Sequence, residues 1–180
     1  MGKKIFVLMG SPRKNGNTSI LCDEFIRGAE EAGHEAEKII IAEKRINGCL
    51  GCGGCQRNGG TCVQKDDMTE LSEKILAADV IVLASPIYYY TWTAQLKAVI
   101  DRTFALLQTM HNKTFYMISA CASPSDEWCG TMLASFREYL GCYDKTVTEG
   151  GYVFGYDTND PGDVRGKDAM TKAYELGRLV

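Results

Sequence analysis

The sequence predicts an α/β fold in which a doubly wound parallel sheet lies between two layers of helices. Two observations predict it. Continuous apolar runs such as Lys4 to Met9 and Asp79 to Ala84 are typical of strands buried on both faces of a parallel sheet. Segments with helical periodicity separate these runs, so strands and helices alternate along the chain. Because 180 residues suffice for one compact core, we expect a single domain over residues 1–180.

Each element has its own signal in the sequence. Apolar runs and alternating segments predict five strands, at Lys4 to Met9, Glu35 to Ile41, Asp79 to Ala84, Lys113 to Ala120 and Thr146 to Phe154. Helical spacing of apolar residues predicts the helices, at Ile20 to Ala32, Met68 to Ala78, Trp92 to Leu107, Trp128 to Leu140 and Asp163 to the end. Ligands of such sheets bind outside the carboxyl ends of the strands, so the loops that follow strands are the candidate sites.

Composition and charge exclude several classes of function. A net charge of -3 argues against a general nucleic-acid binder, which needs a basic surplus. The chain has no run of 18 apolar residues that would span a membrane, and its first ten residues lack the apolar length of an export signal. We therefore expect a cytoplasmic protein, in which the eight cysteines serve chemistry or packing rather than a disulfide framework.

The loop after the first predicted strand, Gly10 to Ser19 (GSPRKNGNTS), leads directly into a helix. The free backbone N–H groups and the positive end of a helix favour a phosphate, Thr18 and Ser19 can donate hydroxyl hydrogen bonds, and Gly16 allows close backbone approach. It is not a Walker A loop, because Asn17 stands where that motif has lysine. The loop therefore predicts a cradle for a monophosphate, with an ordinary turn and helix cap as the alternative.

The loop after the third predicted strand, Ala84 to Trp92 (ASPIYYYTW), is rich in aromatic residues. Pro86 stiffens the turn, and Tyr88 to Tyr90 together with Trp92 offer flat surfaces on which a planar ring can stack. Aromatic residues at the start of a helix also occur in cores and dimer interfaces, which is the competing interpretation. With the phosphate cradle at a neighbouring strand end, this loop completes a site suited to a mononucleotide.

Gly10 to Leu21 and Ser85 to Arg102 resemble the flavodoxin-like NADPH-dependent FMN reductase family, including its iron-sulfur flavoprotein branch. The resemblance extends to the cysteine-rich segment leading into Asp66-Asp67-Met68 and to Asp160 to Asp163, so it covers most of the chain. It implies a flavodoxin-like five-stranded sheet of order 2-1-3-4-5, FMN as cofactor, NAD(P)H as electron donor, and a homodimer or higher homo-oligomer.

The resemblance also implies which residues bind FMN. Those of the first loop would hold its phosphate, and those of the second would line its isoalloxazine ring. The first group is Ser11, Arg13, Gly16, Asn17, Thr18 and Ser19, and the second is Pro86, Ile87, Tyr88, Tyr89 and Tyr90. In the loop after the fourth strand, Ala122 and Ser123 could touch the flavin as well.

A cysteine-rich insertion at about residues 43–66, hereafter the cysteine loop, contains CLGCGGCQRNGGTC. Its thiols Cys49, Cys52, Cys55 and Cys62 are spaced closely enough to hold a [4Fe-4S] cluster. Zinc is a weaker alternative, because zinc sites usually combine two separated CxxC pairs. Relatives of the reductase branch carry similar loops that need not hold metal, so free or paired thiols are the third interpretation. Cys22, Cys121, Cys129 and Cys142 lie elsewhere and read as small buried hydrophobes.

Three functions follow from these features. The first is an enzyme that transfers a hydride from NAD(P)H to FMN and passes electrons to a flavin, quinone or similar small acceptor. The second is an iron-sulfur flavoprotein that carries electrons between redox proteins, and the third is a redox sensor built on the cysteine loop alone. No obligatory acid or base is predicted, and the isolated His34 and His111 read as surface residues.

Overall fold

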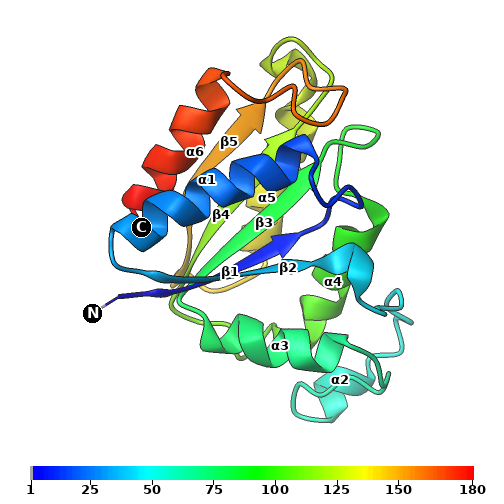
Figure 1. Cartoon of the computed structure of the whole chain (residues 1–180). Helices are drawn as coiled ribbons and strands as arrows, with labels where there is room; N and C mark the ends of the chain where they lie inside the picture. The colour runs from blue at the N-terminus through cyan, green and yellow to red at the C-terminus, as the bar shows by residue number, and fades with distance from the viewer. Residues whose placement is uncertain (1) are drawn as a thin grey trace.

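The structure, a computed structural model that describes residues 2–180, contains a five-stranded parallel sheet of order β2-β1-β3-β4-β5 (Figure 1). The strands are β1 (Lys4–Met9), β2 (Glu35–Ile40), β3 (Val80–Pro86), β4 (Lys113–Ala120) and β5 (Val147–Gly155). This confirms the predicted flavodoxin-like fold and its strand order. The order reverses direction between β1 and β3, which creates the switch point at which ligands bind in such sheets.

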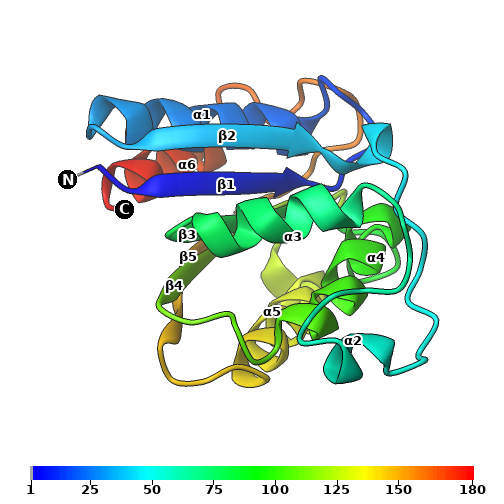
Figure 2. The ribbon, with the colours of Figure 1, turned by 90° about the horizontal axis from the view of Figure 1, so that it is seen from below.

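Helices cover both faces of the sheet and complete three layers (Figure 2). One face carries α1 (Asn17–Glu31) and α6 (Asp168–Arg178), and the other carries α3 (Met68–Ala77), α4 (Ala94–Arg102) and α5 (Gly130–Gly141). The connections add the short helices η1 (Ile41–Glu43), α2 (Gly54–Arg57), η2 (Thr103–Leu106) and η3 (Asp126–Trp128). Among the described residues, no helix is long and apolar enough to cross a membrane.

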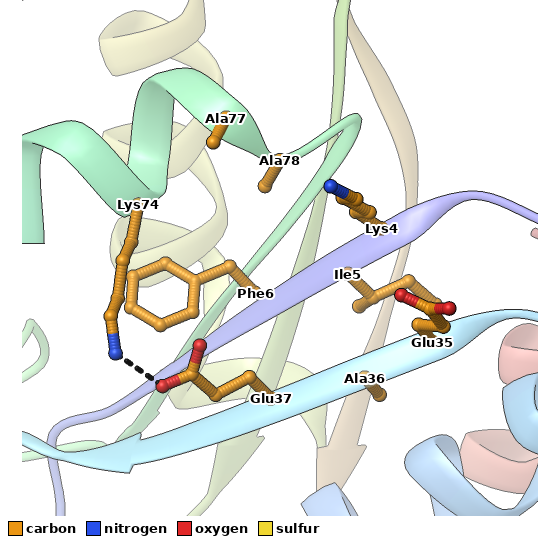
Figure 3. Close-up of a pocket in the computed structure, with 9 residues that line it drawn as sticks. All are labelled: Lys4, Ile5, Phe6, Glu35, Ala36, Glu37, Lys74, Ala77 and Ala78. Carbon is orange, nitrogen blue, oxygen red and sulfur yellow. Dashed lines mark hydrogen bonds and ion pairs between the residues drawn. The ribbon is translucent and has the colours of Figure 1, made fainter.

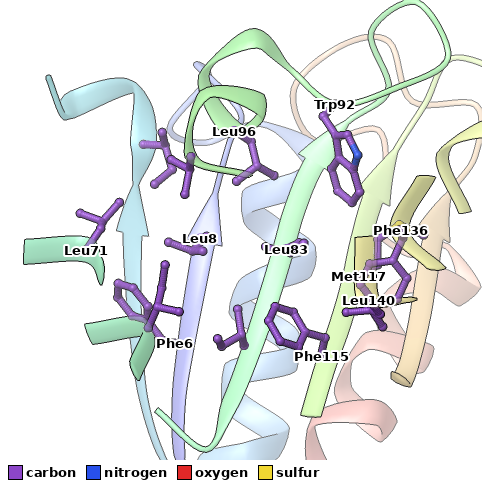
Figure 4. Packing of buried hydrophobic residues seen from close by; sticks show 14 of the residues in the cluster. Phe6, Leu8, Leu71, Leu83, Trp92, Leu96, Phe115, Met117, Phe136 and Leu140 are labelled. Atoms are coloured by element: carbon purple, nitrogen blue, oxygen red, sulfur yellow. The ribbon is translucent and has the colours of Figure 1, made fainter. Parts of the chain in front are cut away.

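The sheet separates two hydrophobic cores because successive side chains of a strand point to opposite faces. In β1, Phe6 and Leu8 join the core beneath α3, α4 and α5, whereas Ile5, Val7 and Met9 join the core beneath α1 and α6. Figure 4 shows the first core, in which Phe6, Leu83 and Phe115 come from three different strands. Burial on both faces explains why these strands appear in the sequence as continuous apolar runs.

Two glycines allow α1 and α6 to pack closely against each other. A Cβ atom on Gly28 would lie 2.1 Å from the carbonyl oxygen of Tyr174, and one on Gly177 would lie 2.0 Å from that of Phe25. Neither position has room for a side chain because backbone occupies the space. This contact anchors α1, and its N-terminus is thereby held at the carboxyl edge of the sheet.

Several element boundaries and environments differ from the prediction. The last helix begins at Asp168 rather than Asp163, because Gly162 and Gly166 adopt positive φ angles and break the helix before it. Trp92 and Trp128 both precede their helices. Cys142 is exposed, so its assignment as a buried hydrophobe was wrong, whereas Cys22, Cys121 and Cys129 are buried as predicted.

Candidate functional site

Four loops meet at the carboxyl edge of the sheet and form one cleft. They follow β1, β3, β4 and β5, and the cleft lies beside the switch point between β1 and β3. The residues that line it are Ser11, Arg13, Gly16, Asn17, Thr18, Pro86, Ile87, Tyr88, Ala120, Cys121, Ala122, Thr158 and Asn159. The predicted phosphate loop and the predicted aromatic loop therefore face the same space.

The first loop presents hydrogen-bond donors to this cleft. The N–H group of Arg13 donates to Ser11 Oγ, which tightens the loop, and Gly16 precedes the first residue of α1. The first residues of a helix have no intrahelical acceptor for their N–H groups, and the described hydrogen bonds include none from the N–H groups of Asn17 and Thr18. These donors and the positive helix end suit a phosphate, so the loop passes this test of fit for FMN.

The side chain of Asn17 has a structural task that the sequence did not reveal. Its Nδ2 donates to the carbonyl of Asp160 at 2.9 Å, while its Oδ1 accepts from the N–H groups of Gly162 and Val164. The backbone N–H group of Asn17, and not its side chain, is therefore available to donate a hydrogen bond to a ligand. The side chain instead fixes the segment after β5 against the phosphate loop, and Arg13 adds to this by donating from Nη1 to the carbonyl of Asn159 at 2.9 Å.

The aromatic loop contains a strained two-residue turn. Tyr88 and Thr91 exchange two backbone hydrogen bonds, at 3.0 and 3.2 Å, and the residues between them have φ angles of 48° for Tyr89 and 68° for Tyr90. Positive φ is unfavourable for bulky residues and is found where the surroundings impose it, often at binding sites. Tyr88 lines the cleft, whereas Tyr89 is 97% exposed and points away from the protein.

The structure does not bring every predicted residue to the cleft. Ser19 is buried and its Oγ accepts from Lys38, while Tyr90 packs beside Trp128 with ring centroids 5.9 Å apart. Trp92 was proposed as stacking surface, and this is wrong, because it is buried in the core and its Nε1 donates to Ser135 Oγ. Of the residues predicted to line a flat ring, Pro86, Ile87 and Tyr88 lie in the cleft lining.

Sequence reasoning also missed part of the lining. Thr158 and Asn159 come from the loop after β5, and Cys121 follows β4. The Thr158 Oγ1 donates to the carbonyl of Cys121 at 3.0 Å, which ties the two loops together. Their position after strands was a usable signal, but the adjacency of β4 and β5 in the sheet was needed to place them beside the phosphate loop.

The four thiols of the cysteine loop line a second cavity of about 260 Å³. Leu50, Val63 and Phe104 make its walls largely apolar, and Gly51 and Gly53 both have a φ of 63°, which bends the chain between the thiols. Within residues 2–180, no three His, Cys, Asp or Glu side chains are placed to bind a single metal ion. The four cysteines that share this cavity are of the ligand type that would hold an iron-sulfur cluster.

A buried ion pair anchors the end of this loop. Arg102 of α4 donates from Nη1 and Nη2 to the two carboxylate oxygens of Asp66, both at 2.9 Å, and from Nη1 to the carbonyl of Asn47. Arg102 and further hydrogen bonds from Asn47 and Met68 lower the pKa of Asp66 to about 2. The side chains of the pair are each 1% exposed.

Arg102 also faces Cys62. A negative charge on Cys62 would raise the pKa of Arg102 further, after the larger effect of Asp66. The Arg102 Nε atom is buried and, among the described residues, has no hydrogen-bond partner. An unsatisfied buried donor beside a cysteine fits a sulfur-rich anionic group, so this end of the loop passes the test of fit for a cluster.

Another cavity, of about 380 Å³, lies at the amino ends of β1 and β2, beside the last turn of α3 (Figure 3). Figure 3 shows Lys74 directed at Glu37, whose Oε1 lies 2.5 Å from Lys74 Nζ. Because ligands of doubly wound sheets bind at the opposite edge, this groove is a surface feature between a helix and an edge strand.

Comparisons with known proteins agree with the fold and identify related flavoproteins. An iron-sulfur flavoprotein of Archaeoglobus fulgidus is 36% identical over 180 residues, which cover 96% of this chain and 76% of the relative. Another from Methanosarcina thermophila is 40% identical over 163 residues, covering 89% and 84%. The solved NAD(P)H:quinone oxidoreductase of Methanothermobacter marburgensis superposes with a TM-score of 0.79 over 99% of this chain and 96% of that chain, and at 16% identity it shows the fold alone.

The family described as NADPH-dependent FMN reductase matches residues 3–148. This range contains β1 to β4, the phosphate loop, the tyrosine turn and the whole cysteine loop. The match covers most of the chain, and it agrees with the resemblance that the loop sequences carried. The chain belongs to the NADPH-dependent FMN reductase family.

Proposed function

We propose that this protein is an FMN-dependent oxidoreductase that takes a hydride from NAD(P)H and passes electrons to a small acceptor such as a flavin or quinone. The observation that carries the proposal is the cleft itself, which joins a helix N-terminus and its phosphate loop to a tyrosine-bearing turn. The family match supports the same reading. When bound, FMN supplies the chemistry, because its ring accepts a hydride and releases electrons.

The protein's own residues would bind and orient this cofactor. The N–H groups that begin α1, the hydroxyl of Thr18 and the guanidinium of Arg13 would hold the phosphate. Pro86, Ile87 and Tyr88 would lie along the ring, and the backbone after β4 would lie beside its polar edge. Hydride transfer from a nicotinamide to a flavin requires no side chain to act as acid or base, and the cleft lining holds no histidine and no carboxylate.

A substitution of Arg13 tests the phosphate assignment. Arg13→Ala removes a charge-assisted contact worth about 1.5–3 kcal/mol, so FMN affinity should fall about 10- to 150-fold. Lys14→Ala is the matched control, because Lys14 is the neighbouring cation but pairs with Glu43 and does not line the cleft. Titration calorimetry with FMN measures both. Equal affinities for the wild type and Arg13→Ala would refute the assignment.

The catalytic part of the proposal has a separate test. The FMN-loaded protein should oxidise NADPH or NADH in the steady state when a quinone or free FMN is supplied. If neither nucleotide reduces the bound flavin under anaerobic conditions, the hydride-transfer function is wrong, even if FMN binds tightly.

A second candidate function is an iron-sulfur flavoprotein that relays electrons between proteins. It is favoured by the cavity shared by Cys49, Cys52, Cys55 and Cys62 and by the unsatisfied Arg102 Nε beside Cys62. Those four cysteines would hold a [4Fe-4S] cluster, which supplies one-electron transfer. Iron and sulfide analysis of anaerobically prepared protein decides this, with about four of each per chain expected. Zinc, or no metal, would overturn it.

We also propose that the protein forms a homodimer or a higher homo-oligomer. Tyr89 and Tyr90 of the tyrosine turn and Trp128, which packs beside Tyr90, are exposed aromatic residues that would gain most from burial by a second copy. Light scattering should give a mass of at least two chains. A monomer at micromolar concentrations would exclude this arrangement.

A further inference from the structure

Two thiols outside the cysteine loop lie next to each other at the cleft. Cys121 directly follows β4 and lines the cleft, and Cys129 directly precedes α5. Their sulfur atoms are 3.6 Å apart, and both side chains are buried. From the sequence alone both residues are expected to be small buried hydrophobes, and neither belongs to the four cysteines of the proposed cluster site.

The backbone holds this pair from both sides. The N–H group of Cys121 donates to the carbonyl of Gly155, and its own carbonyl accepts from the N–H group and the hydroxyl of Thr158. Cys129 is fixed by its N–H group, which donates to Asp126, and by its carbonyl, which accepts from Leu133. The two thiols are therefore held beside each other, and their sulfur atoms must close from 3.6 Å to the bonding distance of about 2.05 Å.

The surroundings make the two thiols unequal. Burial raises the pKa of both, and that of Cys129 reaches about 12. The contact with Cys129 acts in the opposite direction on Cys121, because the Cys129 thiol can donate a hydrogen bond to a Cys121 thiolate. Cys121 is thus the thiol that ionises first, and it is also the one that faces the cleft. Because a thiolate is the reactive form of a cysteine, Cys121 is the thiol of the pair that reacts first.

We propose that Cys121 and Cys129 form a dithiol–disulfide couple that exchanges two electrons with the cofactor of the cleft. Closing the couple breaks two S–H bonds, forms one S–S bond and releases two protons to solvent and two electrons, which oxidised FMN held in the cleft would take up. Opening it consumes two electrons, which reduced FMN would supply, and two protons from solvent. The exchange with FMN rests on the proposed function, whereas the formation of the bond does not.

Packing alone is the competing explanation, and Cys22 shows what it looks like. Cys22 is fully buried in α1, burial raises its pKa to about 12, and its sulfur contacts no other thiol among the described residues. It does not line the cleft. If Cys121 and Cys129 were merely small core residues, all three thiols would behave alike towards oxidants.

The first test maps the bond in the wild-type chain. The protein, without added FMN, is equilibrated anaerobically in buffers of reduced and oxidised dithiothreitol, then acid-quenched, unfolded, alkylated and digested with trypsin. Cys121 and Cys129 share the peptide between Lys113 and Arg137, so a closed couple appears as the loss of two hydrogens and of both alkyl groups. Cys22 and Cys142 lie in other peptides and serve as internal controls.

We expect the bonded peptide to appear with a single midpoint as the buffer becomes more oxidising, while Cys22 remains alkylated. Cys121→Ser and Cys129→Ser should each abolish it. Alkylation of both cysteines at every ratio would overturn the proposal.

The second test counts electrons. The FMN-loaded protein is first oxidised until the couple is closed, and is then titrated anaerobically with a nicotinamide nucleotide. It should consume two electrons per chain more in the wild type than in Cys129→Ser, whose substituted side chain does not line the cleft. Equal counts would show that the couple does not communicate with the flavin and would overturn that part. A protein that forms the bond but fails to bind FMN would refute the proposed function and leave the couple itself standing.

Discussion

The cleft and the cysteine loop both follow strands of one sheet, but different kinds of contact hold them in place. Backbone hydrogen bonds join the loops of the cleft, for example from Gly10 to Ala84 at 2.7 Å and from Ile87 to Ala120 at 2.9 Å. The cysteine loop is joined to the rest of the protein largely by side-chain hydrogen bonds. The main ones run from Arg102 to the Asp66 carboxylate and from Gln56 to the carbonyl of Phe104. The sheet therefore preforms the cleft, while the cysteine loop depends on a few anchors.

The largest effect that tests this difference should come from Arg102→Met. Removing one partner of a buried ion pair leaves Asp66 uncompensated, so the free energy of unfolding should fall by about 3–5 kcal/mol, and the cysteine loop should become sensitive to protease. Lys97→Met is the control on the same helix, because its pair with Asp101 is exposed and worth at most about 1 kcal/mol. Urea unfolding and limited proteolysis measure both. A loop equally resistant in both variants would show that other contacts order it.

The matching experiment on the cleft is Asn17→Ala. The substitution removes three hydrogen bonds to the segment from Asp160 to Val164, so stability should fall by about 1–3 kcal/mol. FMN affinity should fall as well, because Asn159 would lose its fixed position. Asn15→Ala, at an exposed position of the same loop, should change neither quantity. If Asn17→Ala left FMN affinity intact, the backbone bonds alone would define the cleft.

Acid should separate the two regions through Asp66. Its pKa is lowered to about 2 in the folded protein from an ordinary value of 3.8, chiefly by the Arg102 hydrogen bonds. The stabilisation is therefore complete above about pH 4 and is lost as the pH falls through 3.8 towards 2. The difference in unfolding free energy between the wild type and Asp66→Asn should shrink over that range. A difference independent of pH would mean that the carboxylate charge does not stabilise the loop.

The smallest effect is expected in the tyrosine turn. Tyr89 has a φ of 48° and is almost fully exposed, so Tyr89→Asn removes little packing and introduces a residue that tolerates left-handed backbone. Stability should rise by about 1 kcal/mol, as measured by urea unfolding. A loss of stability would indicate that the Tyr89 ring has a partner in solution, such as a second copy of the chain.

Most of the fold could be predicted from sequence patterns because its strands are buried on both faces. Strands such as Lys4 to Met9 have no solvent-facing side, so they appear as continuous apolar runs that are easy to identify. The alternation of strands with helices then allows few topologies. The helical periodicity gave the wrong start for α6, because Gly162 and Gly166 form turns with positive φ before the helix begins. The prediction that Trp92 offers a stacking surface was wrong as well. An aromatic residue before a helix can face either a ligand or the core, and only the packing of the folded chain decides which.

The candidate site was predictable to the extent that it lies in contiguous segments. The residues of Gly10 to Ser19 predict a phosphate loop, and those of Ala84 to Trp92 predict an aromatic turn. The spacing of the thiols from Cys49 to Cys62 predicts a loop that can bind a metal centre. Thr158 and Asn159 have only their position after a strand as a signal, and they approach Arg13 because β5 lies beside β4 in the sheet.

By itself, the sequence of this protein determined the order of its strands and helices, the positions of its phosphate and tyrosine loops, and the presence of a cysteine-rich insertion. Only the tertiary structure decided that Asn17 braces a distant segment, that Arg102 neutralises Asp66 beside Cys62, and that Cys121 meets Cys129 at the cleft. The physical reason is that periodicity and loop chemistry act between neighbours along the chain. Hydrogen bonds, ion pairs and sulfur contacts act between neighbours in space, and the packing of the sheet brings these together.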